Sequence, residues 1–276
     1  MITRTYPPGV TCWIDTEQPD VDAAAAFYSG LFGWTLTDVV PPGAPGRYLI
    51  ATLDGQDVAG IGPATGSDIG WQTYVSVVDA ESTAAAVEPL GGQVIEGPVA
   101  VGPAGRWVAV RDPQGATIRL WQAGRRLGAQ LANVPGAWNF SDLHTTDPDR
   151  ATAFYANLFG WRIVDLGMNS GTLIQVPGYG DHLASTSDPG IHQRQASAPP
   201  GFADVIGGIV IDPDQPPVWQ VTFTVADRDA SAAAAEQLGA TVLASGESAW
   251  TRHARIRDPQ GAELVLSQFS PPDGDR

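Results

Sequence analysis

The feature that most constrains the fold is an internal repeat. The stretch PGVTCWIDTEQPDVDAAAAFYSGLFGW, which begins at Pro8, aligns without a gap with PGAWNFSDLHTTDPDRATAFYANLFGW, which begins at Pro135. Further along, WQTYVSVVDAESTAAAVEPLGG matches WQVTFTVADRDASAAAAEQLGA, and RDPQGATIRLWQ matches RDPQGAELVLSQ. Self-similarity at a fixed spacing indicates a duplicated structural unit. The chain is therefore expected to fold as two related copies.

The repeat also gives domain boundaries. We expect an N-terminal domain at 1–124, a linker at 125–134 and a C-terminal domain at 135–276, with an insertion in the second copy at about 168–217. Each copy contains a strand, a helix and three strands, and then the same series again. Asp20 and Asp147 are predicted helix N-caps, Pro148 suits the first helical position, and Gly33 is predicted to end the first helix.

Composition excludes several classes of function. All 15 basic residues are Arg, so chemistry that needs a lysine amine is absent, and the single Cys cannot form a thiolate zinc site. The net charge of −15 disfavours nucleic acid and anionic membranes as partners. No long apolar run predicts a membrane span. These features indicate a cytoplasmic protein. We also expect a small-molecule partner and either a monomer or a homodimer.

The paired strand-helix-strand units, the FYxxLFGW helix end and the RDPxG turn resemble the vicinal-oxygen-chelate superfamily of glyoxalases, bleomycin-resistance proteins and dioxygenases. PGYGDHLASTSDP and PPGFADVIG are similar to stretches in two-domain glyoxalase-like hydroxylases of high-GC bacteria. Some such proteins accompany aromatic-polyketide antibiotic pathways. The resemblance implies an α+β fold of tandem glyoxalase-like domains, each with two βαβββ modules that form a curved eight-stranded sheet around a cavity.

Enzymes of that superfamily usually carry His or Glu metal ligands on the inner face of the sheet. The matching positions of the first, fifth and eighth strands hold residues that cannot serve as ordinary ligands: Trp13, Thr73 and Arg119 in the first copy, and Phe140, Val221 and Val265 in the second. The position on the fourth strand cannot be aligned. We therefore expect no metal and no other cofactor.

Strand alternation predicts which side chains point inward instead. In the first copy these are aromatic residues around one cation, namely Trp13, Trp71, Trp107, Trp121 and Arg119. Trp and Arg together suit a flat, electron-rich or anionic ligand. The alternative is that the tryptophans fill the sheet interior and that Arg119 pairs with Asp15.

The second copy contains all four His residues. His144, Glu263, His253 and Arg255 are the predicted catalytic residues, because they can move protons or hold an oxyanion near neutral pH. The predicted ligand-binding residues of this copy are Trp138, Phe140, Asp142, Tyr179, His182, Phe202 and Trp219. The alternatives are a solvated His144 at a strand end and a cross-strand ion pair between Arg255 and Glu263.

Three functions remain open. The first is metal-independent binding or transformation of an oxygenated aromatic or polyketide-type metabolite by acid–base chemistry. The second is non-catalytic sequestration of a ligand, as in drug resistance. The third is a metal-dependent glyoxalase. The sequence alone does not decide whether the protein is an enzyme, which ligand it takes or which copy is active.

Overall fold

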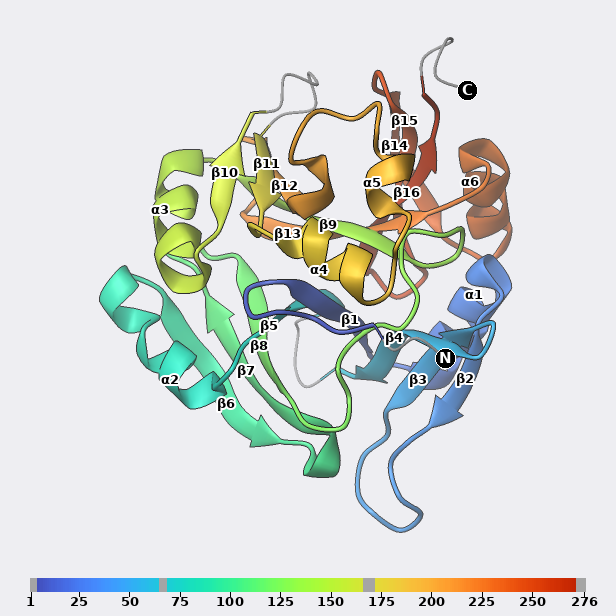
Figure 1. Ribbon diagram of the computed structural model, residues 1–276. Coiled ribbons are helices and arrows are strands. Elements are labelled where there is room, and N and C mark those ends of the chain that lie inside the picture. The colour runs from blue at the N-terminus through green and yellow to red at the C-terminus, as the bar shows by residue number, and fades with distance from the viewer. Residues whose placement is uncertain (1–3, 65–68, 166–171, 272–276) are drawn as a thin grey trace. The chain divides into compact units, whose positions relative to one another are not determined.

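The computed structural model describes residues 4–64, 69–165 and 172–271. Figure 1 shows strands and helices alternating along the whole of this part of the chain. No helix among these residues is long and apolar enough to cross a bilayer.

The first copy forms an eight-stranded mixed sheet with strand order β2-β3-β4-β1-β5-β8-β7-β6. The pairs β1–β4 and β5–β8 are parallel, and the hairpins are antiparallel. Its elements are β1 (Thr11–Gln18), α1 (Val21–Phe32), β2 (Thr35–Asp38), β3 (Leu49–Leu53), β4 (Gln56–Pro63), β5 (Gly70–Ser76), α2 (Ala80–Ala85), η1 (Glu88–Leu90), β6 (Gln93–Ala100), η2 (Gly102–Ala104), β7 (Gly105–Arg111) and β8 (Thr117–Ala123).

The second copy forms another eight-stranded sheet with the equivalent order β10-β11-β12-β9-β13-β16-β15-β14. Its elements are β9 (Trp138–Thr145), α3 (Pro148–Phe159), β10 (Arg162–Val164), β11 (Thr172–Gln175), α4 (Tyr179–Ser185), α5 (Ile191–Arg194), η3 (Phe202–Asp204), β12 (Val205–Ile211), β13 (Val218–Thr224), α6 (Arg228–Gln237), β14 (Thr241–Glu247), β15 (Thr251–Arg257) and β16 (Glu263–Phe269). The α+β fold with a tandem duplication, expected from the repeat, is confirmed.

Local signals in the sequence place the helix ends correctly. The Asp20 carboxylate accepts hydrogen bonds from the Asp22 and Ala23 amides, and the Asp147 carboxylate accepts one from the Arg150 amide. Gly33 ends α1 with a φ of 73°, a left-handed conformation that favours glycine. The stretch predicted as an insertion, 168–217, includes strands β11 and β12. The segment without a counterpart in the first copy lies between them and contains α4, α5 and η3.

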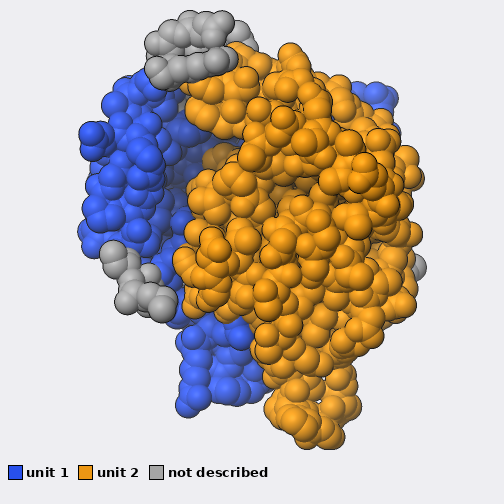
Figure 2. All heavy atoms as spheres, turned by 90° about the vertical axis from the view of Figure 1, so that its right-hand side faces the viewer, with its two compact units in different colours: residues 1–12, 73–128, 141–219 blue, residues 13–72, 129–140, 220–276 orange. Residues whose placement is uncertain are grey.

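The chain packs as two compact units, and each unit combines half of one copy with half of the other. Unit 1 contains residues 1–12, 73–128 and 141–219, and unit 2 contains residues 13–72, 129–140 and 220–276, as Figure 2 shows by colour. The compact units therefore do not follow the boundaries of the sequence copies.

In each unit, a buried Tyr–Asp–Trp hydrogen-bond network joins a helix of one copy to a turn of the other copy. In unit 2 the Tyr28 hydroxyl of α1 donates to Asp258 Oδ2 at 2.8 Å, and in unit 1 the Tyr155 hydroxyl of α3 donates to Asp112 Oδ2 at 3.0 Å. Both aspartates belong to RDPQG turns, and the other oxygen of each accepts backbone amides of its own turn. Each RDPQG aspartate thus shapes its turn, as predicted, and also anchors a helix from the other copy.

Candidate functional site

The best-developed polar cluster in unit 1 surrounds His144, near the end of β9. β12 runs parallel to β9 with Ile211 opposite Thr145, so the residue after β12, Asp212, lies beside the end of β9. Asp212 Oδ2 lies 3.1 Å from His144 Nδ1, and the Gln215 amide nitrogen lies 2.6 Å from the same carboxylate oxygen. Both the His144 and Asp212 side chains are partly accessible.

Two side chains approach His144 Nδ1, since the Gln215 amide nitrogen lies 2.7 Å from this atom and Asp212 Oδ2 lies 3.1 Å from it. A carboxylate only accepts and an amide N–H only donates, so the contact with Asp212 suits the tautomer with the hydrogen on Nδ1 and the contact with Gln215 suits the tautomer with the hydrogen on Nε2. The contact with His144 lowers the pKa of Asp212, which keeps this carboxylate charged. In the tautomer with the hydrogen on Nδ1, Nε2 carries the lone pair, which is the arrangement of a general base oriented by a carboxylate. The predicted alternative of a solvated His144 at a strand end agrees with its partly accessible side chain near the end of β9.

Asp142 lies two residues before His144 and therefore on the same face of β9. Burial raises the pKa of Asp142, whereas the charge of His144 and the backbone amide of Gly208 act in the opposite direction. A Cβ atom added at Gly208 would lie 3.0 Å from Asp142 Oδ1, so the carboxylate lies directly against β12. Phe140 is half-buried at the position two residues earlier on the same strand, and Trp138, two residues before that, is buried.

In unit 2 the predicted residues of β15 and β16 lie on one face. Ala254 and Ile256 are fully buried on the other face, which confirms the predicted alternation of β15. Glu263 forms a 2.7 Å ion pair with Arg257 and lies 4.0 Å from Arg255. The cross-strand ion pair left open by the sequence is thus present, although its nearer partner is Arg257.

His253 lies over β14, opposite Gly246. A Cβ atom at Gly246 would lie 2.7 Å from the His253 ring, so this position requires the absence of a side chain. Burial, assisted by the charge of Arg228, lowers the pKa of His253. His253 therefore remains neutral at lower pH than an exposed histidine does.

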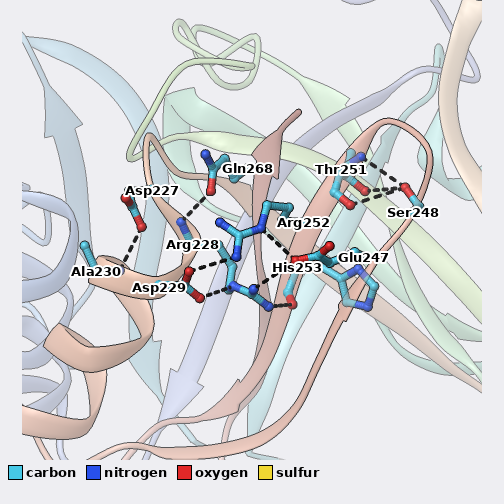
Figure 3. Close-up of polar contacts among 10 residues, drawn as sticks. All are labelled: Asp227, Arg228, Asp229, Ala230, Glu247, Ser248, Thr251, Arg252, His253 and Gln268. Carbon is cyan, nitrogen blue, oxygen red and sulfur yellow. Dashed lines mark hydrogen bonds and ion pairs between the residues drawn. The ribbon is translucent and has the colours of Figure 1, made fainter. Parts of the chain in front are cut away.

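An ion-pair network holds the backbone beneath His253. Arg228, at the start of α6, is buried and donates to the His253 carbonyl at 3.0 Å. Arg252 bridges Asp229 at 2.8 Å and Glu247 at 2.9 Å (Figure 3). These contacts join α6 to the β14–β15 hairpin and fix the strand that carries His253.

In the first copy, unit 1 contains the aromatic cluster predicted around Arg119. The guanidinium carbon of Arg119 lies 4.6 Å from the centre of the Trp107 ring, and Arg119 Nη1 donates to the Tyr74 hydroxyl at 2.7 Å. Tyr74 makes an edge contact with Trp121. The sequence predicted Trp107, Trp121 and Arg119 here but missed Tyr74.

Trp71 and Trp219 lie on the opposite face from the one predicted. Trp71 donates to the Tyr28 hydroxyl at 3.1 Å, and Trp219 donates to the Tyr155 hydroxyl at 2.9 Å, so both pack against helices. Tyr74 and Arg119 are paired in register, which places Gln72, Tyr74 and Ser76 on the other face of β5. Both faces of β5 are largely buried, so alternation alone could not decide between them.

In unit 2, Trp13 and Asp15 share a tyrosine that the sequence analysis did not identify. Trp13 Nε1 donates to the Tyr48 hydroxyl at 3.1 Å, and this hydroxyl donates to Asp15 Oδ2 at 2.8 Å. Tyr48 immediately precedes β3, a strand from which the sequence analysis selected no candidates.

Two predicted residues of the long segment between β11 and β12 contact the residues that precede β1 in unit 1. Arg4 donates to the Tyr179 hydroxyl at 3.1 Å, and His182 Nε2 lies 2.9 Å from Thr5 Oγ1. Phe202 and His192 line a cavity of about 260 Å³ near α5 and η3; its other lining residues are Gln195, Ala196, Ala198, Pro199, Pro200, Gly201 and Ala203. Tyr179 and His182 therefore make structural contacts, and Phe202 lies on a separate surface hollow.

Comparison with known proteins identifies the family. Residues 140–267 match the model described as "Glyoxalase-like domain", and residues 18–120 match "Glyoxalase/Bleomycin resistance protein/Dioxygenase superfamily". The chain is 36% identical over 276 residues to "Putative glyoxylase CFP32" of Mycobacterium tuberculosis (strain CDC 1551 / Oshkosh), covering 96% of this chain and 97% of that protein. The chain belongs to the glyoxalase/bleomycin resistance/dioxygenase superfamily.

Other members extend this comparison. The chain is 34% identical over 283 residues to "Anthracycline biosynthesis protein DnrV" of Streptomyces peucetius, covering 96% of this chain and 94% of that protein. Among solved structures, a Mn(II)-bound glyoxalase from Novosphingobium aromaticivorans has a TM-score of 0.59 at 15% identity, covering 98% of this chain and 86% of that one. The structural likeness at this identity shows the shared fold alone.

The metal chemistry of such superfamily members can be tested against the donors of this chain. Within residues 4–64, 69–165 and 172–271, no group of three or more His, Cys, Asp or Glu side chains comes together in a way that could hold a metal ion. The aligned positions instead present Trp13 hydrogen-bonded to Tyr48 and Arg119 stacked on Trp107. A guanidinium repels a divalent cation, so these residues do not fit a metal, and no step is assigned to one.

Proposed function

We propose that this superfamily member binds and transforms an oxygenated aromatic, polyketide-type metabolite by metal-independent acid–base chemistry. The proposed site is the face of β9 that carries Asp142 and His144. The observation that carries the proposal is the contact between His144 Nδ1 and the Asp212 carboxylate at 3.1 Å. The proposal takes the tautomer with the hydrogen on Nδ1, in which Nε2 is the base. The relationship to an anthracycline biosynthesis protein supports the substrate class. The net charge of −15 supports a small-molecule ligand rather than nucleic acid, and we place the protein in the cytoplasm.

The chemistry assigned to His144 is removal of a proton from carbon next to a carbonyl group. His144 Nε2 takes the proton, and Asp212 stabilises the imidazolium that forms. The electron pair left on carbon moves onto the carbonyl oxygen. His253 and Arg255 belong to unit 2, and this proposal assigns them no part in the step at His144.

Glu263 is assigned no proton-transfer role in this proposal. Its carboxylate is ion-paired with Arg257 at 2.7 Å, so the guanidinium competes with a substrate for this carboxylate. Glu263 therefore provides a matched control for His144, because both were candidate bases in the second copy.

The test is hydrogen exchange at the α-carbon of 6-hydroxy-1-tetralone in D₂O, followed by proton NMR. We expect the wild-type protein to accelerate exchange, His144→Ala to remove the acceleration, and Glu263→Gln to change it less than about threefold. Asp212→Asn should reduce the rate by about 10- to 100-fold, the effect of losing one charge-assisted hydrogen bond. Full activity in His144→Ala would overturn the assignment of the base.

The second candidate function is ligand sequestration without chemistry. The cluster of Trp107, Tyr74 and Trp121 around Arg119 favours it, because such a group binds flat or anionic rings without a reactive step. Tight binding of the tetralone with no acceleration of exchange by the wild-type protein would support sequestration and contradict the acid–base proposal.

A further inference from the structure

The two copies place a carboxylate at the same position of their first strands. In the gapless alignment of the repeat, Asp15 of β1 corresponds to Asp142 of β9. Asp15 pairs with Gly60 of β4. In the second copy His144 pairs with Val210 and Leu143 with Ile209, so one further step along the register places Asp142 opposite Gly208 of β12.

The glycines opposite these carboxylates provide space rather than an unusual backbone conformation. Neither Gly60 nor Gly208 is among the residues with positive φ, so any residue could adopt their backbone geometry. A Cβ atom at Gly60 would lie 2.2 Å from the Tyr48 hydroxyl oxygen and 2.6 Å from Tyr48 Cζ. The absence of a side chain at Gly60 thus allows the Tyr48 phenol to lie against the strand and to donate to Asp15.

The second copy keeps the glycine and the carboxylate, but among its described residues no phenol lies at this position. The three atoms nearest to a Cβ atom at Gly208 belong to Asp142 and Thr172. The stretch 166–171, which precedes β11 as Tyr48 precedes β3, contains no aromatic residue. The Asp142 side chain has no side-chain hydrogen bond within the described part of the chain, and only the Gly208 amide favours its charged form by hydrogen bonding.

We infer that Asp142 binds the hydroxyl group of a phenolic ligand, and that the ligand ring lies against Gly208 as the Tyr48 ring lies against Gly60. The first copy therefore carries its own phenol in the place where the second copy takes one from solution. This inference rests on the proposed function, because it names the substrate class of the same β9 face. A phenol O–H donating to a carboxylate is a charge-assisted hydrogen bond, which a methyl ether cannot form.

The experiment compares 6-hydroxy-1-tetralone with 6-methoxy-1-tetralone by isothermal titration calorimetry, at a pH where the phenol is neutral. We expect the wild-type protein to bind one hydroxy compound per chain at least about tenfold more tightly than the methoxy compound. Asp142→Asn should weaken only the hydroxy compound, and Asp15→Asn should leave this preference unchanged. Equal affinity for the two compounds, or an unchanged preference in Asp142→Asn, would overturn the inference.

The first copy offers an independent measurement. Tyr48→Ala opens the space over Gly60, and p-cresol, which has the chemistry of the missing side chain, should then raise the melting temperature of this variant more than toluene does. Adding Asp15→Asn should remove the difference between the two compounds, whereas an equal effect of p-cresol and toluene on Tyr48→Ala would contradict the phenol–carboxylate pairing. Tyr48→Phe serves as the folding control. If the phenol preference fails while His144→Ala still abolishes α-proton exchange, this inference fails and the proposed function stands.

Discussion

The duplicated Tyr–Asp–Trp network allows a sharp test of what holds each unit together. Tyr155→Phe removes one hydroxyl group and leaves the ring in place. That hydroxyl donates to Asp112 Oδ2 at 3.0 Å and accepts from Trp219 Nε1 at 2.9 Å. Tyr155, Asp112 and Trp219 are all at least 97% buried, so water cannot replace the lost partner.

The magnitude follows from the number of groups left without a partner. A buried donor or acceptor that loses its partner costs about 1–3 kcal/mol. Two groups are affected, but Asp112 Oδ1 keeps three backbone amides, which continue to stabilise the carboxylate. We expect Tyr155→Phe to lower the free energy of unfolding by about 2–4 kcal/mol, and the melting temperature by about 5–12 °C for a chain of this size.

The matched variant in the other unit is Tyr28→Phe. There the Asp258 Oδ2 atom keeps a hydrogen bond from Gln18 Nε2 at 2.8 Å, so the carboxylate stays paired, whereas Trp71 Nε1 and the Thr16 hydroxyl lose the Tyr28 oxygen. We expect a loss of about 1–2 kcal/mol, smaller than for Tyr155→Phe. Urea unfolding followed by circular dichroism measures both. A loss for Tyr28→Phe that equals or exceeds that for Tyr155→Phe would refute the reasoning.

Three further predictions concern the functional faces. Burial raises the pKa of Asp142, so the native state holds this proton more tightly than the unfolded chain does, and ionisation costs stability above the native pKa. Asp142→Asn should therefore stabilise the protein at neutral pH, with a gain in melting temperature that fades towards about pH 4; a gain independent of pH would contradict this cause. The lowered pKa of His253 means that the unfolded chain binds this proton more tightly, so stability is lost as pH falls below about 6.5. His253→Gln should flatten the melting temperature between about pH 7 and pH 5, and an unchanged slope would count against the shift. Gly246→Ala would place a Cβ atom 2.7 Å from the His253 ring. It should displace the imidazole resonances in NMR spectra and lower stability by about 1–3 kcal/mol, whereas unperturbed resonances would show that the ring does not depend on this glycine.

Local chemistry made several features predictable. The caps at Asp20 and Asp147 and the turns that follow Asp112 and Asp258 depend on hydrogen bonds within a few residues of each side chain. The repeat predicted the order of elements along both copies, because two related sequences fold in the same way. The alternation of β15 was also readable, since Ala254 and Ile256 are apolar and their neighbours are charged or polar.

Long-range packing decided what the sequence could not. The direction of Trp71 and Trp219 could not be predicted, because β5 and β13 are largely buried on both faces. Alternation with a period of two does not say which of two buried faces contacts the helices. Asp212 and Tyr48 were missed because each approaches its partner only through strand pairing.

By itself, then, the sequence determined the duplication, the α+β modules, their caps and turns, and the concentration of histidines in the second copy, because local hydrogen bonding and periodicity carry that information. Only the tertiary structure decided that Asp212 contacts His144 and that Arg257 forms an ion pair with Glu263. It also decided that Tyr48 lies against Asp15 and Gly60, whereas the described residues of the second copy place no tyrosine against Asp142 and Gly208. These features depend on residues far apart in sequence that meet only when strands pair, and strand register is a property of the whole sheet.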